Sequence, residues 1–199
     1  FRKMGVVTTC SCTPYLFGNL PHFGEHIAWA ESSAVCYANS VIGARTNREG
    51  GPGALSAALT GVTPEYGLHL STNRVPTLSV DVEAEVSSTY AYGALGRVIG
   101  EILENRQTKP IPYIIGITPP SLEELKSFCA SIATYGGAAL FHMPGITPEA
   151  SQYQPPDEHV RVSQLAVDKA AEQMDEPGEE VDFVTLGCPH LSLNEIKQI

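Results

Sequence analysis

The sequence lacks any apolar run approaching the roughly 20 residues that a membrane-spanning helix needs. It also lacks a basic segment followed by an apolar one, so no signal peptide is predicted. Positive charge is scarce, because 12 lysines and arginines stand against 22 aspartates and glutamates and form no basic stripe. These absences argue against a membrane partner and against a nucleic-acid partner.

Cysteines are few and have no framework spacing. The five, at positions 10, 12, 36, 129 and 188, are an odd number, which favours a reducing compartment, most simply the cytoplasm. Cys36 and Cys129 lie inside apolar helical patterns and are expected to be small buried residues. Cys10, Cys12 and Cys188 stand among turn formers, so they are the candidates for chemistry.

What the sequence does contain is an alternation of short apolar runs and helical patterns. Strands are predicted at 6–9, 77–82, 113–116, 138–141 and 183–186, and helices at 26–42, 54–59, 90–104, 125–135 and 160–174. Capping boxes at Ser121–Glu124 and Ser192–Glu195 mark two helix starts. The alternation predicts an α/β fold, with a mainly parallel sheet and helices on both faces. Residues 1–199 form one region or two α/β subdomains with a boundary near 105–112.

The densest polar stretch follows the predicted helix at 26–42. It reads Arg45, Thr46, Asn47, Arg48 and Glu49, and a Gly-Gly-Pro-Gly run then opens the next helix. Two guanidinium groups, an amide and a helix N-terminus suit a carboxylate or phosphate, so an anionic small-molecule substrate is expected. The alternative is a surface loop whose arginines pair with nearby glutamates.

Cys12 and Cys188 each follow a predicted strand. Ligands of parallel sheets sit off the carboxyl ends of the strands, so two loops there could present thiolates to one iron or zinc. Two or three cysteines do not complete a structural zinc site of four ligands. Three thiolates and one open iron would instead make a catalytic cluster.

The chain resembles the catalytic, large part of the aconitase X family in four segments: CTPYLFGNLPHFGEHIAWAESSAVCYANSVIGARTNREGG, LTGVTPEYGLHL, FHMPGITPEA and LGCPHLS. The resemblance implies an aconitase-like fold and the dehydration of a small hydroxy acid. It favours mevalonate 5-phosphate dehydratase activity, with cis-3-hydroxy-L-proline dehydratase activity as the alternative. A non-catalytic module that keeps the fold is the alternative of another class.

The resemblance also implies an iron–sulfur cluster, of the 4Fe–4S type, held by three cysteines. Cys12 and Cys188 match two of these ligands. Because the chain starts at Phe1 and ends just after the second capping box, a piece of a longer protein is expected, with the third ligand beyond Ile199. Cys10 lies outside the motif.

The resemblance further implies a small swivelling domain or small subunit as the partner, and that partner would supply the catalytic base. Arg45 and Arg48 would clamp the substrate's carboxylate or phosphate. The second donors would be Ser33, Asn39, Thr46 and Asn47. For Ser33 and Asn39, packing inside the helix is the alternative interpretation. Lys3, Arg74 and Arg97 are the other cations available for a phosphate.

Overall fold

The centre of the fold is a parallel sheet. The computed structural model describes residues 1–175, 178, 180 and 182–199, and among these the strands are β1 (Leu78–Val82), β2 (Pro112–Ile115) and β3 (His159–Val162). Their order is β2-β1-β3, so β1 pairs in parallel with both neighbours. β1 is buried along nearly its whole length, as a central parallel strand should be. The predicted α/β class and parallel sheet are confirmed.

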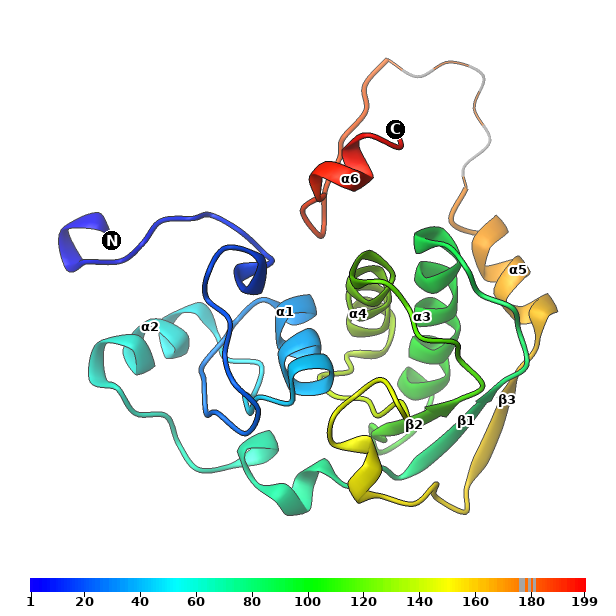
Figure 1. Ribbon diagram of the computed structural model, residues 1–199, viewed down its shortest axis with the longest axis horizontal. Coiled ribbons are helices and arrows are strands. Elements are labelled where there is room, and N and C mark those ends of the chain that lie inside the picture. Colours follow the sequence, from blue (N-terminus) through cyan, green and yellow to red (C-terminus); the bar gives the residue numbers. More distant parts are fainter. Residues whose placement is uncertain (176–177, 179, 181) are drawn as a thin grey trace.

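Two long helices, α3 (Thr89–Glu104) and α4 (Leu122–Gly136), lie side by side next to this sheet (Figure 1). Glycines on α3 permit the close approach: a Cβ at Gly96 would meet the Phe128 carbonyl oxygen at 2.9 Å, and one at Gly100 would meet the Tyr135 Cβ at 2.8 Å. α5 (Gln164–Glu172) packs against the other side of α3. The predicted helices at 90–104 and 125–135 are confirmed, as is the capping box at Ser121.

The first 75 residues carry shorter elements. α1 (Ser32–Tyr37) packs against α4 and continues into the wider π-helical turn η3 (Ala38–Ile42), and α2 (Gly51–Thr60) follows. The short turns elsewhere and the last helix are η1 (Arg2–Met4), η2 (Pro14–Leu16), η4 (Gly67–His69), η5 (Ser71–Arg74), η6 (Ala150–Gln152) and α6 (Leu193–Ile196).

The predicted helix at 26–42 is wrong in its first part. The Glu31 side chain accepts a hydrogen bond from the Ala34 backbone N–H at 2.7 Å, which caps α1 and fixes its start at Ser32. Residues 26–29 are therefore extended, and they pair in parallel with residues 45–48 through single bridges. The prediction at 160–174 is wrong in the same way, because 160–162 belong to β3 and the Ser163 side chain caps α5.

Three predicted strands are absent. Runs 6–9 and 183–186 are irregular, with Val7 82% and Phe183 83% exposed, because no strand among the described residues lies beside them to pair with their backbone groups. Run 138–141 is largely buried, but the Phe141 N–H donates to the Ser40 hydroxyl at 2.9 Å, so a side chain takes the place of a strand partner. Only His142 bridges to β2.

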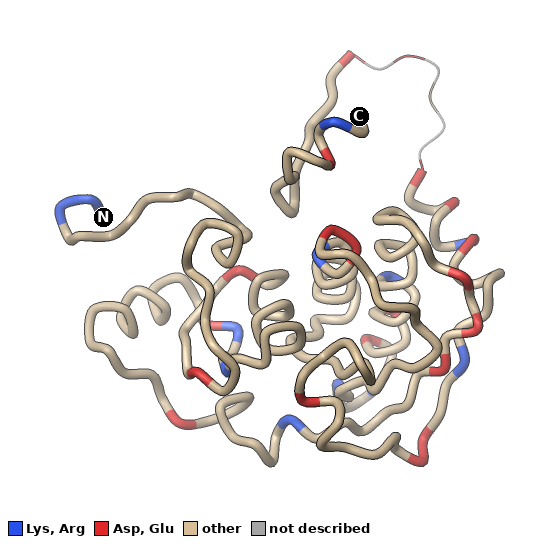
Figure 2. Tube along the Cα trace, viewed as in Figure 1, with Lys and Arg blue, Asp and Glu red and all other residues tan. Residues whose placement is uncertain are grey.

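Residues 105–111 connect α3 to β2, so the predicted range 105–112 covers this connection and the first residue of β2. The subdomain boundary predicted there stays a prediction. Lysines and arginines are scattered along the trace and do not gather on one element (Figure 2). Within the described part of the chain, no helix combines the length and the apolar character needed to cross a bilayer.

Candidate functional site

The loop that carries Arg45–Arg48 begins at a left-handed turn. Gly43 has φ 77°, and a Cβ there would lie 2.6 Å from the Phe23 ring. The chain then runs beside residues 25–29, where the Arg45 N–H donates to the Glu25 carbonyl oxygen at 2.8 Å. The Glu49 N–H donates to the Trp29 carbonyl oxygen at 3.0 Å. The loop's backbone is thus fixed at both ends.

Asn39 fastens this loop from inside. It is fully buried, and both ends of its amide pair with Thr46: Nδ2 donates to the Thr46 carbonyl oxygen at 2.8 Å and Oδ1 accepts from the Thr46 N–H at 3.0 Å. Nδ2 also donates to the Ala139 carbonyl oxygen at 3.0 Å. Asn39 therefore positions the loop, and its donors and its acceptor are engaged within the protein.

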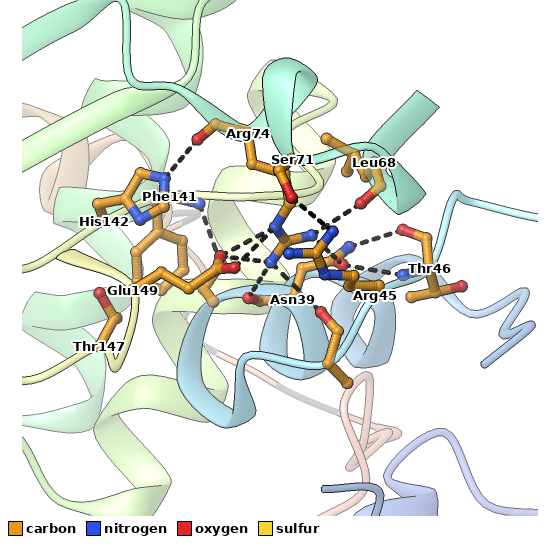
Figure 3. A network of polar contacts seen from close by, with 12 residues as sticks. Asn39, Arg45, Thr46, Leu68, Ser71, Arg74, Phe141, His142, Thr147 and Glu149 are labelled. Carbon is orange, nitrogen blue, oxygen red and sulfur yellow. Dashed lines mark hydrogen bonds and ion pairs between the residues drawn. The ribbon is translucent and has the colours of Figure 1, made fainter. Parts of the chain in front are cut away.

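Asn39 also contacts a buried ion pair, formed by Arg74 and Glu149 (Figure 3). Arg74, fully buried, donates from Nε and Nη2 to the Glu149 carboxylate at 2.6–3.1 Å. The same guanidinium donates from Nη1 to Asn39 Oδ1 at 3.0 Å and from Nη2 to the Asn39 carbonyl oxygen at 2.9 Å. A bidentate guanidinium pair is the geometry in which two buried charges satisfy each other. The base of the loop is consequently rigid.

The two loop arginines reach different segments. Arg45 is half-buried, and its Nη1 donates to the His69 carbonyl oxygen and to Ser71 Oγ, both at 2.9 Å. Arg48 is exposed, and its Nη2 donates to the Gly137 carbonyl oxygen at 3.0 Å, just past the end of α4. The arginines bind backbone carbonyls here, not the glutamates of the surface-loop alternative.

The remaining predicted donors are engaged within the protein. Thr46 Oγ1 donates to the Asn47 carbonyl oxygen at 2.7 Å, and Ser33 Oγ donates to Glu31 Oε2 at 2.7 Å. Asn47 holds the η4 turn, where its Oδ1 accepts from the Leu68 N–H at 2.8 Å. A Cβ at Gly67 would lie only 2.1 Å from that oxygen, so glycine is required there. These contacts agree with a supporting role for the three side chains.

The loops of Cys12 and Cys188 meet, although they are 176 positions apart in the numbering. The His190 N–H donates to Cys12 Sγ at 3.1 Å, two residues after Cys188. Cys188 is exposed and Cys12 is partly exposed. The predicted cause of their approach is wrong, since neither cysteine follows a strand. The described residues contain no group of three His, Cys, Asp or Glu side chains placed to hold a metal.

A second buried ion pair holds the Cys188 loop in place. Lys126, on α4, donates from Nζ to the His190 carbonyl oxygen at 2.8 Å and pairs with Glu195 of α6. Burial raises the pKa of Glu195, yet the hydrogen bonds from Lys126 and from the Ser192 N–H outweigh it and leave the pKa below its ordinary value. The carboxylate is therefore ionised and paired, and α4 is what brings Cys188 to Cys12.

The other cysteines behave as the sequence predicts. Cys36 and Cys129 are fully buried, and burial together with the Cys36 thiol raises the pKa of Cys129. Beside them Tyr15 stacks on Tyr37 with ring centroids 4.1 Å apart, and burial raises the pKa of Tyr37 to about 12. Cys10 is exposed and has φ 51°. Only Cys12 and Cys188 combine exposure with mutual approach.

Sequence reasoning missed both buried ion pairs. The sequence presents Arg74 and Arg97 as cations available for a phosphate, whereas Arg74 is paired with Glu149 and Arg97 with Glu101 at 2.8 Å. Glu149 stands in the FHMPGITPEA segment, whose His142 is also buried and bonds through Nε2 to the Arg74 carbonyl oxygen at 2.8 Å. The available signal for a buried ion pair was a charged residue with apolar neighbours in the sequence. The partner could not be inferred in the same way, because it lies 75 positions away for Arg74 and 69 positions away for Lys126.

Comparison with known proteins places these features in a family. The family model described as "Aconitase X first domain" matches residues 1–72, and the one described as "Aconitase X second domain" matches residues 76–172. The chain belongs to the aconitase X family. The structure agrees: it matches the crystal structure of Thermococcus kodakaraensis aconitase X (holo-form) with a TM-score of 0.90 and 45% identity, over all of this chain and 50% of that one.

Curated aconitase X relatives carry two names. The phosphomevalonate dehydratase large subunit of Methanothermobacter thermautotrophicus is 48% identical and that of Methanocaldococcus jannaschii 45%, both over the whole chain. The cis-3-hydroxy-L-proline dehydratase of Hypocrea jecorina is 36% identical. The chain spans about half the length of the two large subunits, 49% and 51%, and 35% of the Hypocrea protein.

Proposed function

We propose that this chain is part of the large subunit of a phosphomevalonate dehydratase, a hydro-lyase that eliminates water from mevalonate 5-phosphate. The observation that carries the proposal is the 44–48% identity, over the whole chain, to four large subunits of that name, against 36% and 35% to two hydroxyproline enzymes; the Aeropyrum pernix large subunit is more distant, at 34%. The name "large subunit" supports a small-subunit partner, which would supply the catalytic base. The reaction belongs to isoprenoid biosynthesis by the mevalonate pathway, and five free cysteines favour the cytoplasm.

An iron–sulfur cluster, of the 4Fe–4S type, is the proposed cofactor. The donor set fits in part: two thiols, both accessible, stand on loops joined by the contact between His190 and Cys12, and thiolates are the ligands that such clusters prefer. Cys12 and Cys188 would hold it, with a third thiolate from outside residues 1–199. When bound, such a group supplies a Lewis acid for a leaving hydroxyl.

The chain's own part in the reaction is to bind and orient the anionic substrate. Arg45 and Arg48 would take the carboxylate or phosphate, because each uses a single Nη atom in the described hydrogen bonds. Asn39 and Thr46 keep the loop backbone in place through their paired hydrogen bonds. Ser33 and Asn47 support the neighbouring turns, at the start of α1 and at η4.

The test uses the full-length large subunit assembled with its small subunit and reconstituted without oxygen. We expect Cys12→Ser and Cys188→Ser to lower bound iron and to abolish turnover of mevalonate 5-phosphate. Cys10→Ser is the matched control, since it removes an exposed thiol two residues from Cys12, and it should keep both iron and turnover. A Cys188→Ser enzyme with full iron and full rate would sink the cluster assignment.

The same assay separates the alternatives. Turnover of cis-3-hydroxy-L-proline without turnover of mevalonate 5-phosphate would replace the proposed substrate. Turnover of neither, with no iron retained by the assembled protein, would favour a non-catalytic module.

A further inference from the structure

A cavity of about 720 Å³ lies beside the Arg45 loop, and none of the proposed cluster or clamp residues lines it. Its apolar wall comes from three sources: α2, the turn after α2, and the extended segment 26–29. The apolar lining residues are Ile27, Ala28, Trp29, Ala54, Ala57, Ala58, Gly61, Val62 and Pro64. The polar lining residues are fewer: Asn19, His26, Thr63, Glu65 and His69. An apolar wall with a few convergent polar groups is typical of a small-molecule site.

Two histidines face each other at this cavity. The Nδ1 atoms of His26 and His69 are 2.8 Å apart, and the rings are stacked with centroids 5.1 Å apart. His69 is only 3% exposed, whereas His26 is an exposed residue. The buried ring of His69 thus contacts the exposed ring of His26 through one nitrogen of each. The second nitrogen of His26, Nε2, is left for a ligand.

Either ring could donate across this contact, so the tautomers follow from the surroundings of His69. Burial is the main cause that lowers the pKa of His69, followed by His26; Glu49 opposes them, Arg74 and Arg45 lower the pKa further, and the net direction favours the neutral ring at pH 7. Its buried Nε2 has no partner among the described residues. Orphaned buried N–H groups are rarer than under-satisfied acceptors, so we place the His69 hydrogen on Nδ1, donated to His26. His26 then carries its hydrogen on Nε2.

We propose that this cavity binds a small organic acid, whose apolar body lies against the alanines of α2 and whose carboxylate or phosphate oxygen accepts the hydrogen bond of His26 Nε2. His26 is the ligand-binding residue, and His69 is a positioning residue that sets its tautomer and ring orientation. The donor selects an oxygen acceptor, and the apolar wall selects an aliphatic group. Glu65, the one acidic side chain in the lining, opposes the ligand charge.

The test is a binding titration on the full-length protein without iron, so its result does not depend on turnover. Trp29 is the only tryptophan of these 199 residues and lines the cavity, so the difference in fluorescence between the protein and its Trp29→Phe variant reports occupancy. The probes are isovalerate, isopentyl phosphate and the uncharged isopentanol, which share one branched carbon skeleton. We expect at least one acid to bind ten or more times tighter than the alcohol, and the two acids distinguish a carboxylate ligand from a phosphate.

Variants assign the roles. His26→Phe should abolish the preference for the acid, and Glu65→Gln should tighten acid binding. His69→Phe should weaken acid binding as His26→Phe does. His69→Gln can still donate an amide N–H to Nδ1 of His26, so its affinity for the acid should stay within about threefold of the parent's. His22→Gln is the matched control, since His22 pairs with Glu25 at 3.2 Å and does not line the cavity.

Three results would overturn the proposal: equal binding of alcohol and acids, an unchanged preference in His26→Phe, or no signal that depends on Trp29. Because His26 is exposed, its variant tests the site even if a change at buried His69 prevents folding. Equal binding by His69→Phe and the parent would remove the positioning role alone.

Discussion

Two buried ion pairs stabilise this molecule, and they join different parts of it. Arg74 lies between the parts matched by the two family models, residues 1–72 and 76–172, and joins them: its guanidinium pairs with Glu149 in the second part and bonds Asn39, Ala44 and Leu68 in the first. Among the residues that the structure describes, the Lys126 side chain bonds only the segment that contains His190 and Glu195. In Figure 1 that segment, with α6, extends from the main body above the start of α4.

The difference lies in what must open before water can reach the charges. Arg74 cannot be hydrated unless η3, the η4–η5 turns and the Glu149 loop separate from one another. That separation requires the main body of the protein to unfold. Lys126 and Glu195 can be hydrated when one short segment leaves α4. The first pair should therefore contribute to global stability and the second to the local position of Cys188.

Removing the first pair should have the largest effect. We expect Arg74→Ala to lower the free energy of unfolding by about 3–5 kcal/mol, because it leaves the Glu149 carboxylate buried without its partner. Denaturant titration followed by circular dichroism measures this.

The matched control for that change is Arg161→Ala. It breaks a surface pair with Glu83, in which the two side chains are 76% and 55% exposed, and should cost no more than about 1 kcal/mol. If Arg74→Ala were as mild as Arg161→Ala, the interior pair would not be a global contact.

The central fold could be predicted because its signals are local. β1 is a short apolar run, and α4 begins at a capping box, so neighbouring residues suffice to place them. The runs at 6–9 and 183–186 are equally apolar but stay irregular, because a strand also needs a partner at the right distance. Residues 26–29 show the converse, since the Glu31 cap overrides the helical spacing before it.

The site could be predicted only as separate pieces. The sequence pointed to Cys12, Cys188 and the Arg45 loop, but not to what positions them. Lys126 meets Glu195 across 69 residues and Arg74 meets Glu149 across 75, and such pairings depend on the whole topology. The predicted approach of the two cysteine loops is observed, yet it depends on α4 and Lys126 rather than on strand ends.

Removing the second pair should act locally. We expect Lys126→Met to release the segment 188–196, because the hydrogen bonds of a charged donor contribute about 1.5–3 kcal/mol and methionine can still fill the space on α4. Backbone amides of 190–196 should then exchange with deuterium at least ten times faster in mass spectrometry, while the global free energy of unfolding changes by less than about 1 kcal/mol.

Lys169→Met, on α5, serves as the control for loss of a lysine, since Lys169 makes no described ion pair, and exchange at 190–196 should be unaffected. A global loss comparable with that of Arg74→Ala would show that the two ion pairs do not differ in kind.

The smallest and sharpest test uses the two capping boxes, which share one geometry but lie in the two regions. The Ser121 hydroxyl accepts from the Glu124 N–H at 3.2 Å, and the Ser192 hydroxyl accepts from the Glu195 N–H at the same distance. Replacing an N-cap serine by alanine costs about 1 kcal/mol.

Ser121→Ala should lower the global free energy of unfolding by that amount, because α4 is part of the main body. Ser192→Ala should leave the global value unchanged and instead speed amide exchange in α6 about fivefold, since the lost cap weakens only a segment that opens independently. Equal global losses from the two serines would mean that α6 unfolds together with the sheet, and the division into a central fold and a separately docked cysteine segment would then be wrong.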